Sequence, residues 1–133
     1  ADGPPIPVRP RAFSAARPWL PVKAQHLPLS VAAQDRDAGS VLAHYRAALA
    51  FRRAHPVLRT GAMLDIWATG DVASFRRSGD EEIFCAVNLG EFTAEAVLPD
   101  GNWTRIGTEL GSQAATGGRA SLGPWGVCLA KRT

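Results

Sequence analysis

Long apolar runs are absent from this sequence. No stretch approaches the roughly 20 consecutive apolar residues that a membrane-spanning helix requires. The first residues, ADGPPIPVRPRAF, lack the apolar core of a signal peptide. We therefore expect a soluble, cytoplasmic protein with no membrane partner.

The short motifs that mark cofactor, metal and hydrolase sites are also missing. The chain has no glycine-rich phosphate loop and no G-x-S-x-G elbow, although composition alone leaves a Ser-His-Asp arrangement open. His26, His44 and His55 lack the spacing of metal ligands, and no cysteine pair accompanies them. We therefore assign no cofactor, no metal ligand and no catalytic residue, and the substrate-binding residues stay unknown at this stage.

Cysteine is scarce, with only Cys85 and Cys128, each in an apolar stretch that alternates like a strand. If those two strands are neighbours, a disulfide is geometrically conceivable. Buried free thiols are the favoured interpretation, because cysteines in an apolar setting are usually buried and the cytoplasm is reducing.

What the sequence does contain is enough apolar material for one ordinary domain. Its 133 residues are 46% hydrophobic and 20% charged, which are values of a globular chain rather than a disordered one.

Charge is distributed unevenly along the chain. Residues 1–60 hold nine basic against three acidic residues, a net charge of +6, whereas residues 61–133 hold six against nine, a net charge of −3. A basic half is compatible with nucleic-acid binding. However, these arginines are spread over a proline-rich segment and one helix, with no interleaved aromatic residues. We predict ion pairs with an acidic protein surface and no nucleic-acid partner. The excess of arginine, 13 against 2 lysines, is typical of a GC-rich bacterial source.

The N-terminal third is rich in proline. Seven of the ten prolines lie within residues 1–36, where each fixes its own φ and disfavours helix in the residue before it. We expect an extended coil that docks onto another surface, because it also carries several large apolar side chains: Phe13, Trp19, Leu20, Val22, Leu27 and Leu29.

A helix is predicted over residues 38–54. Apolar residues recur there at three- and four-residue spacing and form one stripe. Asp37 or Ser40 can cap the helix start, and Pro56 ends the element. The stripe consists of Val41, Leu42, Tyr45, Ala48 and Leu49.

After Gly61 the apolar period changes from 3.6 to 2, as expected for β-strands. Residues 83–89 alternate with apolar residues on both faces, which predicts a strand packed on both sides. Residues 116–118 are expected to form a loop. Short strands at this spacing favour an antiparallel sandwich. The other candidate strands are residues 64–68, 72–77, 93–98, 103–109 and 126–131.

Two segments carry a family resemblance. Residues 13–22, FSAARPWLPV, and residues 40–61, SVLAHYRAALAFRRAHPVLRTG, resemble the C-terminal end of an α-glucosidase of glycoside hydrolase family 13, the α-amylase family. Its oligo-1,6-glucosidase and maltose-acting members read FS…PWLPV and then SVL..YR.L...R...P.L..G. Residues 74–77 and 122–127 also fit the family's C-terminal domain, whereas residues 1–12 do not match its pattern.

The resemblance implies an α+β architecture in two parts. Residues 1–60, a coil and one long helix, would be the remnant of a (β/α)8 barrel, and residues 61–133 would be the antiparallel β-sandwich called domain C. The family's nucleophile aspartate, acid/base glutamate and transition-state aspartate lie earlier in the barrel and have no counterpart here. The resemblance therefore implies a C-terminal fragment of a retaining α-glucosidase, which is inactive by itself and whose parent acts on oligosaccharides or disaccharides.

The carboxylates of this chain have simpler interpretations than catalysis. Residues 80–82, Asp-Glu-Glu, follow a Ser-Gly pair and are predicted to form a solvated turn. Asp35 and Asp37 precede the helix, where capping explains them.

Two alternatives remain, a non-catalytic carbohydrate-binding sandwich and an assembly module. Trp19, Trp67, Trp103 and Trp125 suggest sugar stacking, although packing in a core or interface is the commoner role of tryptophan. If part of a barrel is missing, Tyr45, Leu49 and Phe51 should be uncovered and should promote self-association or docking of the proline-rich coil onto the helix.

Overall fold

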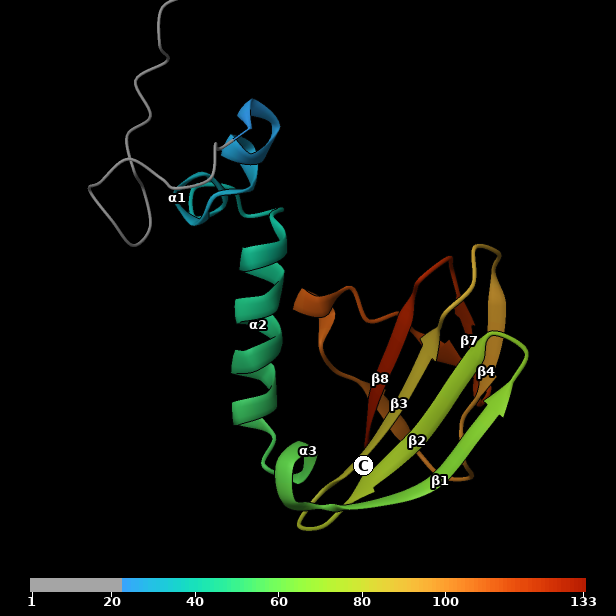
Figure 1. Cartoon of the computed structure of the whole chain (residues 1–133). Helices are drawn as coiled ribbons and strands as arrows, with labels where there is room; N and C mark the ends of the chain where they lie inside the picture. The colour runs from blue at the N-terminus through green and yellow to red at the C-terminus, as the bar shows by residue number, and fades with distance from the viewer. Residues whose placement is uncertain (1–22) are drawn as a thin grey trace, which may run out of the picture. The chain divides into compact units, whose positions relative to one another are not determined.

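The computed structural model describes residues 23–133 (Figure 1). Most of the proline-rich coil, the FSAARPWLPV stretch and Trp19 lie outside the described residues. The chain divides into two compact units, of which the first ends at Arg46 and the second is Ala47–Thr133. Within residues 23–133, no helix is both long enough and apolar enough to cross a membrane.

The described part of the first unit contains η1 (Ala24–Leu29), α1 (Val31–Gln34) and the start of α2 (Val41–Ala54). Short helices thus occupy part of the segment predicted to be coil. Ser30 caps α1 by accepting a hydrogen bond from the Ala33 amide at 3.3 Å. The Gln34 side chain then connects the elements, because it donates to the Leu29 carbonyl at 2.8 Å and accepts from the Leu42 amide at 3.0 Å.

The predicted long helix is confirmed as α2, which begins at Val41 rather than Ala38. The later start has a local cause. The Asp37 carboxylate accepts from the Gly39 amide at 2.8 Å in a turn, and Ser40 is the capping residue, its hydroxyl accepting from the Ala43 amide at 3.2 Å. After Pro56 the chain forms one short further helix, α3 (Val57–Thr60).

The apolar side chains of α2 are only partly uncovered. Tyr45 is 62% exposed and Val41 is 79% exposed, whereas Phe51 is 8% exposed, so the expectation of an uncovered Phe51 is wrong. Its ring lies 4.5 Å from the His55 ring. It also lies close to Gly107, where an added Cβ would meet the Phe51 ring at 3.4 Å. This aromatic side chain therefore belongs to the core of the second unit.

The second unit is built from two antiparallel sheets. The first has five strands in the order β1-β2-β3-β8-β5, and the second has three in the order β4-β7-β6. A short 3₁₀ turn, η2 (Thr108–Leu110), follows β5. The strands are β1 (Ala62–Thr69), β2 (Val72–Ser78), β3 (Glu82–Asn88), β4 (Ala94–Val97), β5 (Trp103–Arg105), β6 (Ala115–Thr116), β7 (Arg119–Leu122) and β8 (Val127–Arg132).

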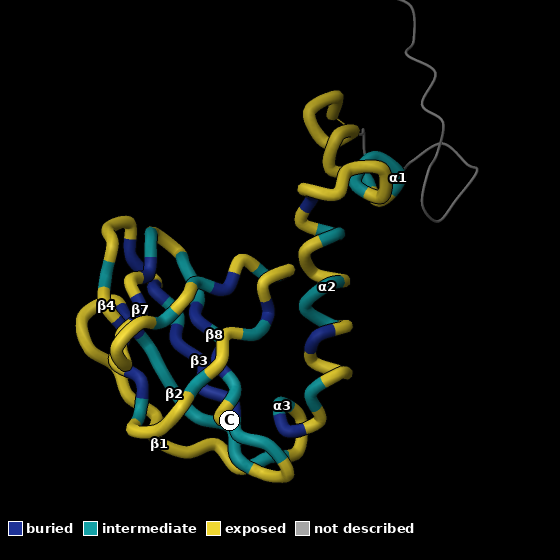
Figure 2. The backbone as a smooth tube through the Cα atoms, turned by 180° about the vertical axis from the view of Figure 1, so that it is seen from behind, coloured by how far each residue is buried: buried dark blue, intermediate teal, exposed yellow. Residues whose placement is uncertain are grey.

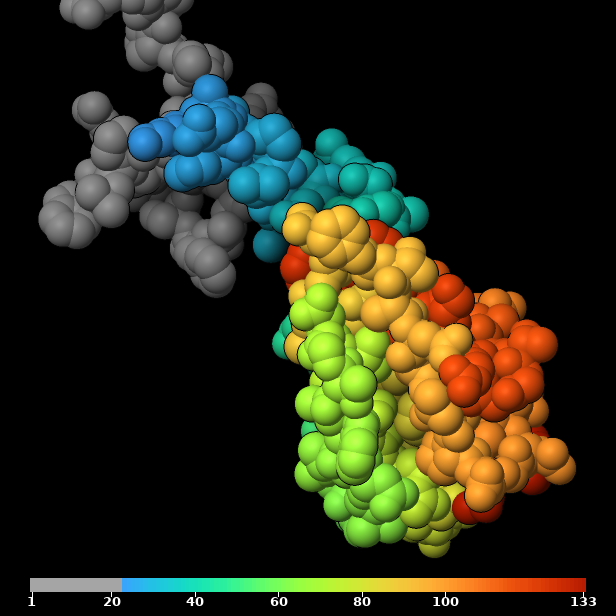
Figure 3. Space-filling model, turned by 90° about the vertical axis from the view of Figure 1, so that its right-hand side faces the viewer, coloured from blue at the N-terminus to red at the C-terminus, as the bar shows by residue number. Residues whose placement is uncertain are grey.

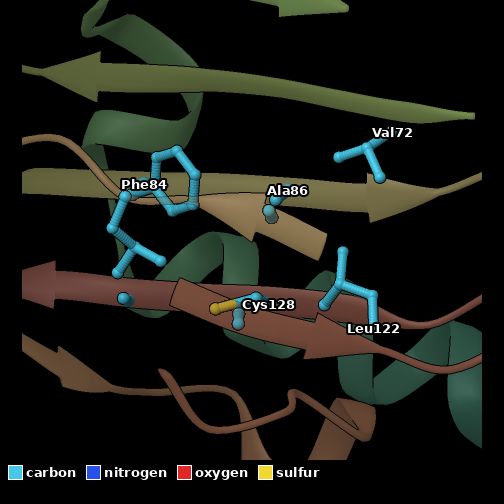
Figure 4. Close-up of a cluster of buried hydrophobic side chains, with 9 residues drawn as sticks. Val72, Phe84, Ala86, Leu122 and Cys128 are labelled. Atoms are coloured by element: carbon cyan, nitrogen blue, oxygen red, sulfur yellow. The ribbon is translucent and has the colours of Figure 1, made fainter. Parts of the chain in front are cut away.

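A buried apolar cluster joins the two sheets and confirms the predicted sandwich. Leu122 of the smaller sheet packs with Phe84, Ala86 and Cys128 of the larger one, and Figure 4 shows these side chains gathered between the strands. Because each sheet supplies one apolar face, the cluster is the main core of this unit.

The larger sheet is also covered on its second face. There Ile83 and Cys85 of β3 pack with Val57 of α3, Phe75 and Leu129. β3 thus alternates between two cores, as its two-sided apolar pattern predicted. Figure 2 shows buried positions concentrated along the central strands of the larger sheet.

Several predicted strand boundaries differ from the observed ones by one or two residues, and two regions differ more clearly. The strand expected over residues 103–109 ends at Arg105, because Gly107 takes a left-handed conformation (φ +68°) that begins η2. The expected loop at residues 116–118 is the turn of a hairpin formed by β6 and β7. Gly117 and Gly118 both have positive φ there, +59° and +75°, as a tight hairpin turn requires.

The two cysteines are close in the sheet but cannot form a disulfide. Their strands are neighbours, with Ala86 opposite Cys128 and Cys85 opposite Leu129. Cys128 lies in the cluster between the sheets, whereas Cys85 lies in the cluster on the other face. Since the two thiols point to opposite faces, both stay free, and the favoured prediction is confirmed.

We expect both thiols to be unreactive in the folded protein. Burial raises the pKa of the Cys85 thiol to about 12 and also raises the pKa of Cys128, so neither forms the reactive thiolate at mildly alkaline pH. Titration with Ellman's reagent should label no thiol in buffer and both in denaturant. Rapid labelling of either cysteine in buffer would contradict the structure.

Candidate functional site

The acidic run at residues 80–82 is the densest group of carboxylates in the sequence. Asp80 is exposed, as expected for a solvated turn. For the other two residues that prediction is wrong. Glu81 binds Lys131 Nζ at 2.9 Å and His55 Nδ1 at 3.1 Å, and its side chain is 15% exposed.

Glu82 lies at the start of β3 and joins two arginines. One carboxylate oxygen accepts from Arg76 Nη1 at 3.0 Å, and the other from Arg132 Nη1 at 2.7 Å. Arg76 and Arg132 come from the strands on either side of β3, so the carboxylate links three neighbouring strands. These contacts make Glu81 and Glu82 structural ion-pair residues.

Both glutamates are held in the ionised form. The hydrogen bond from Arg132 lowers the pKa of Glu82, and burial opposes this shift only partly. Burial raises the pKa of Glu81, but hydrogen bonds from Lys131 and His55 outweigh it and leave that pKa below its ordinary value. A general acid for glycoside hydrolysis needs a raised pKa instead.

This network predicts a loss of stability in acid. A carboxylate whose pKa is depressed by folding stabilises the fold above its unfolded pKa, and that stability is lost as the pH falls through the lower, folded pKa. Urea midpoints measured from neutral pH to below pH 4.5, the ordinary glutamate value, should therefore decline. Glu82→Gln should remove on the order of 1 kcal/mol at neutral pH and flatten that decline.

The control for this experiment is Glu109→Gln, because Glu109 is exposed in η2. It should leave both the stability at neutral pH and its decline in acid unchanged. An equal flattening in the two variants would reject the role given to Glu82.

The arginines of the helical region take different roles. Arg46 forms an ion pair with Asp35. The predicted capping role of Asp35 at the start of α2 is therefore wrong, because Ser40 caps that helix. Arg52 and Arg53 are exposed at the end of α2, so the prediction that they pair with an acidic partner surface stays a prediction. In the second unit Arg77 donates to the Val57 carbonyl at 3.2 Å and the Gly61 carbonyl at 2.7 Å, which holds α3 against β2.

The described tryptophans divide into one packed and two exposed side chains. Trp103 is half-buried, with its ring 6.1 Å from Phe84 and its indole N–H donating to the Pro99 carbonyl at 2.8 Å. Trp67 and Trp125 are each 69% exposed, so the expected packing role is wrong for both.

Trp67 forms one wall of a groove of about 440 Å³ at the open side of the sandwich. The lining includes Arg76, whose Nε donates to Asp65 Oδ2 at 2.5 Å. The full lining is Asp65, Trp67, Ser74, Arg76, Phe84, Val97, Leu98 and Pro99. Among these residues the sequence suggests a sugar contact only for Trp67, because the others are brought together only by strand pairing.

A second groove, of about 490 Å³, lies beside α3 and the hairpin between β2 and β3. Glu81 and Lys131 contribute to its lining, but they neutralise each other there. Within residues 23–133 there is also no group of three or more His, Cys, Asp or Glu side chains that could hold a metal ion.

Two known proteins with similar sequences are both named as glucosidases. No protein-family model matches the chain. A probable α-glucosidase of Rhizobium meliloti is 44% identical over 88 residues, which are 65% of this chain and 16% of that protein. The oligo-1,6-glucosidase of Parageobacillus thermoglucosidasius is 29% identical over 91 residues, covering 66% of this chain and 16% of the relative. The match thus spans about a sixth of the length of both relatives.

The fold has a close counterpart among solved structures. The crystal structure of the α-glucosyl transfer enzyme XgtA aligns with a TM-score of 0.79 and 35% identity, over 91% of this chain and 23% of that enzyme. The resemblance noted in the sequence is therefore confirmed by both sequence and fold. This chain is similar, in sequence and in fold, to a part of α-glucosidase-type enzymes.

Proposed function

We propose that this chain supplies the C-terminal portion of an α-glucosidase-type glycoside hydrolase. In this proposal residues 1–60 complete a catalytic barrel and residues 61–133 form its β-sandwich domain. The whole enzyme hydrolyses α-glucosidic bonds of oligosaccharides or disaccharides by a retaining mechanism, in the cytoplasm. The observation that carries the proposal is the 44% identity with a probable α-glucosidase.

We further propose that the chain contributes no catalytic group. A retaining glycosidase needs two carboxyl groups roughly 5 Å apart, one ionised and one protonated. Glu81 and Glu82 fail this requirement because the pKa of each is lowered and each is bound by two basic side chains. Their role is to fix the sandwich.

An activity assay of the isolated chain tests its non-catalytic role. Incubation with p-nitrophenyl α-glucoside should release no nitrophenol above the buffer rate, while an intact α-glucosidase assayed in parallel should release it readily. Turnover that copurifies with the chain and disappears in Glu81→Gln or Glu82→Gln would overturn the proposal.

A second candidate function, an assembly module, is favoured by the exposed apolar residues of the first unit. Val31, Val41 and Tyr45 are 57%, 79% and 62% exposed, which is unusual for side chains of this size. Sizing chromatography with light scattering should then reveal dimers or larger species that Tyr45→Glu shifts toward the monomer. A monomer at all concentrations would reject self-association.

A further inference from the structure

We propose that the groove beside Trp67 is a saccharide-binding site that takes a glucosyl unit of an oligosaccharide. The groove lies between β1 and the segment that follows β4, and Figure 3 faces this side, with β1 in green and that segment in orange. The choice of an α-linked glucosyl ligand rests on the proposed function. The site itself rests on the geometry of the groove.

An irregularity in β1 shapes the site. Leu64 pairs with Arg76, but Trp67 pairs with Ser74. Between these two pairs β1 advances by three residues while β2 advances by only two. This β-bulge places Asp65 at a φ of +50°, a left-handed conformation that is costly for a residue other than glycine. Strained backbone of this kind persists only where the surrounding structure holds it in place, and it is concentrated at ligand and active sites.

The bulge brings an ion pair into the groove. Asp65 Oδ2 accepts from Arg76 Nε at 2.5 Å, and this hydrogen bond is the main reason that the pKa of Arg76 is raised. Glu82 holds the guanidinium from the other side at 3.0 Å, so the Arg76 side chain is fixed and only 18% exposed. A guanidinium has five N–H donors, and a carboxylate has further lone pairs. Donors and acceptors therefore remain for the hydroxyl groups of a ligand.

The Trp67 ring is oriented in advance. Its indole N–H donates to Thr69 Oγ1 at 2.6 Å while the side chain is 69% exposed. The hydrogen bond limits rotation of an aromatic surface that nothing in the described structure covers. Val97 and Pro99 add apolar lining to the groove.

The combination matches a sugar better than a purely apolar ligand. A pyranose ring presents an apolar C–H face that packs on an indole, and its equatorial hydroxyl groups need donors and acceptors at the edge. Here one aromatic wall stands beside a fixed Arg–Asp pair and the Ser74 hydroxyl. A volume of about 440 Å³ lies in the range of small-molecule sites and leaves room for one or two sugar rings.

Titration of the full chain with maltotriose tests the site, read from the indole N–H resonances in two-dimensional NMR spectra. The Trp67 resonance should shift saturably with a dissociation constant on the order of 1 mM. Trp67→Ala lacks this reporter, so its affinity is compared with that of the parent chain by isothermal titration calorimetry, and it should be weaker by roughly tenfold or more. Asp65→Asn, which keeps a residue tolerant of positive φ but removes the charge, should weaken binding by about threefold.

The matched control is Trp125→Ala. Trp125 is also 69% exposed but does not line the groove, so this variant should bind as tightly as the parent chain. Urea midpoints would verify that each variant is folded. If Trp67→Ala does not fold, the maltotriose affinity of Asp65→Asn is the test of the site. The proposal is overturned if the parent chain gives no saturable shift, if Trp125→Ala loses as much affinity, or if cellobiose binds and maltotriose does not.

Failure of this site can be distinguished from failure of the hydrolase proposal. Hydrolysis by an enzyme that contains this sandwich does not require Trp67. An active enzyme whose groove binds no sugar would reject only the saccharide site. Sugar binding by the chain, without any activity of the assembled enzyme, would reject only the hydrolase proposal.

Discussion

Asn88→Ala is expected to destabilise the sandwich by about 3 kcal/mol or more, because it removes a completely buried amide that contacts three carbonyls and one N–H group of the backbone. Asn88 is completely buried at the end of β3. Its amide nitrogen lies within hydrogen-bond distance of the Phe92, Gly123 and Leu122 carbonyls, at 2.7, 2.9 and 3.2 Å. Its carbonyl oxygen accepts from the Gly90 amide at 2.9 Å. One side chain thus joins the turn after β3 to the end of β7.

Urea denaturation followed by circular dichroism measures this effect. A loss of about 3 kcal/mol is a large share of the 5–15 kcal/mol that stabilises an ordinary domain, so the variant should unfold at far lower urea. Asn102→Ala is the matched control, because Asn102 is exposed and only its backbone carbonyl takes part in a hydrogen bond, with Thr133. Equal midpoints for the two variants would show that the Asn88 amide is dispensable.

Leu122→Ala should cost about 3 kcal/mol as well, through a cavity between the two sheets. Leu122 of β7 is 0% exposed and packs in the cluster formed with Phe84, Ala86 and Cys128 of the larger sheet. The smaller sheet has only three strands, so few other side chains can move to fill the space.

Leu89→Ala serves as the control for Leu122→Ala, since it removes the same atoms from a side chain that is 60% exposed. It should change the free energy of unfolding by less than about 1 kcal/mol. If Leu89→Ala destabilises the protein as strongly as Leu122→Ala, the core does not lie between the two sheets as described.

The parts of the fold that the sequence predicts are those with strong local patterns. The helix stripe from Val41 to Leu49 repeats over several turns, and Pro56 stops it, so α2 was predictable apart from its first residues. Residues 83–89 carry apolar side chains on both faces, and β3 indeed alternates between two cores. In both cases the signal lies within one element and needs no distant partner.

The hairpin of β6 and β7 was not predicted, because its residues have weak intrinsic strand preference. Apart from Leu122, its strands contain only alanine, serine, arginine and threonine, and the side chains that pack in the core are Ala115, Ala120 and Leu122. Their conformation depends on pairing with β4 and on packing against the larger sheet. Strand preference of this kind is set by the environment, which a single sequence does not display.

The candidate sites could not be predicted from the sequence for a related reason. Glu82 and Arg132 are 50 residues apart, and only the pairing of β3 with β8 brings them together. The bulge at Asp65 and the open side of the sandwich that exposes Trp67 likewise appear only in three dimensions. Residue type suggested that Trp67 could stack on a sugar, but only the structure supplied the neighbouring Arg76.

Grafting tests directly whether this chain forms the C-terminal portion of an α-glucosidase-type enzyme. The segment of the Rhizobium meliloti probable α-glucosidase that matches this chain would be replaced by the corresponding residues, and hydrolysis of p-nitrophenyl α-glucoside measured. We predict a soluble chimera with activity within roughly tenfold of the parent enzyme, or about 1.4 kcal/mol in the barrier. A folded chimera without activity, alongside an active parent, would contradict the account.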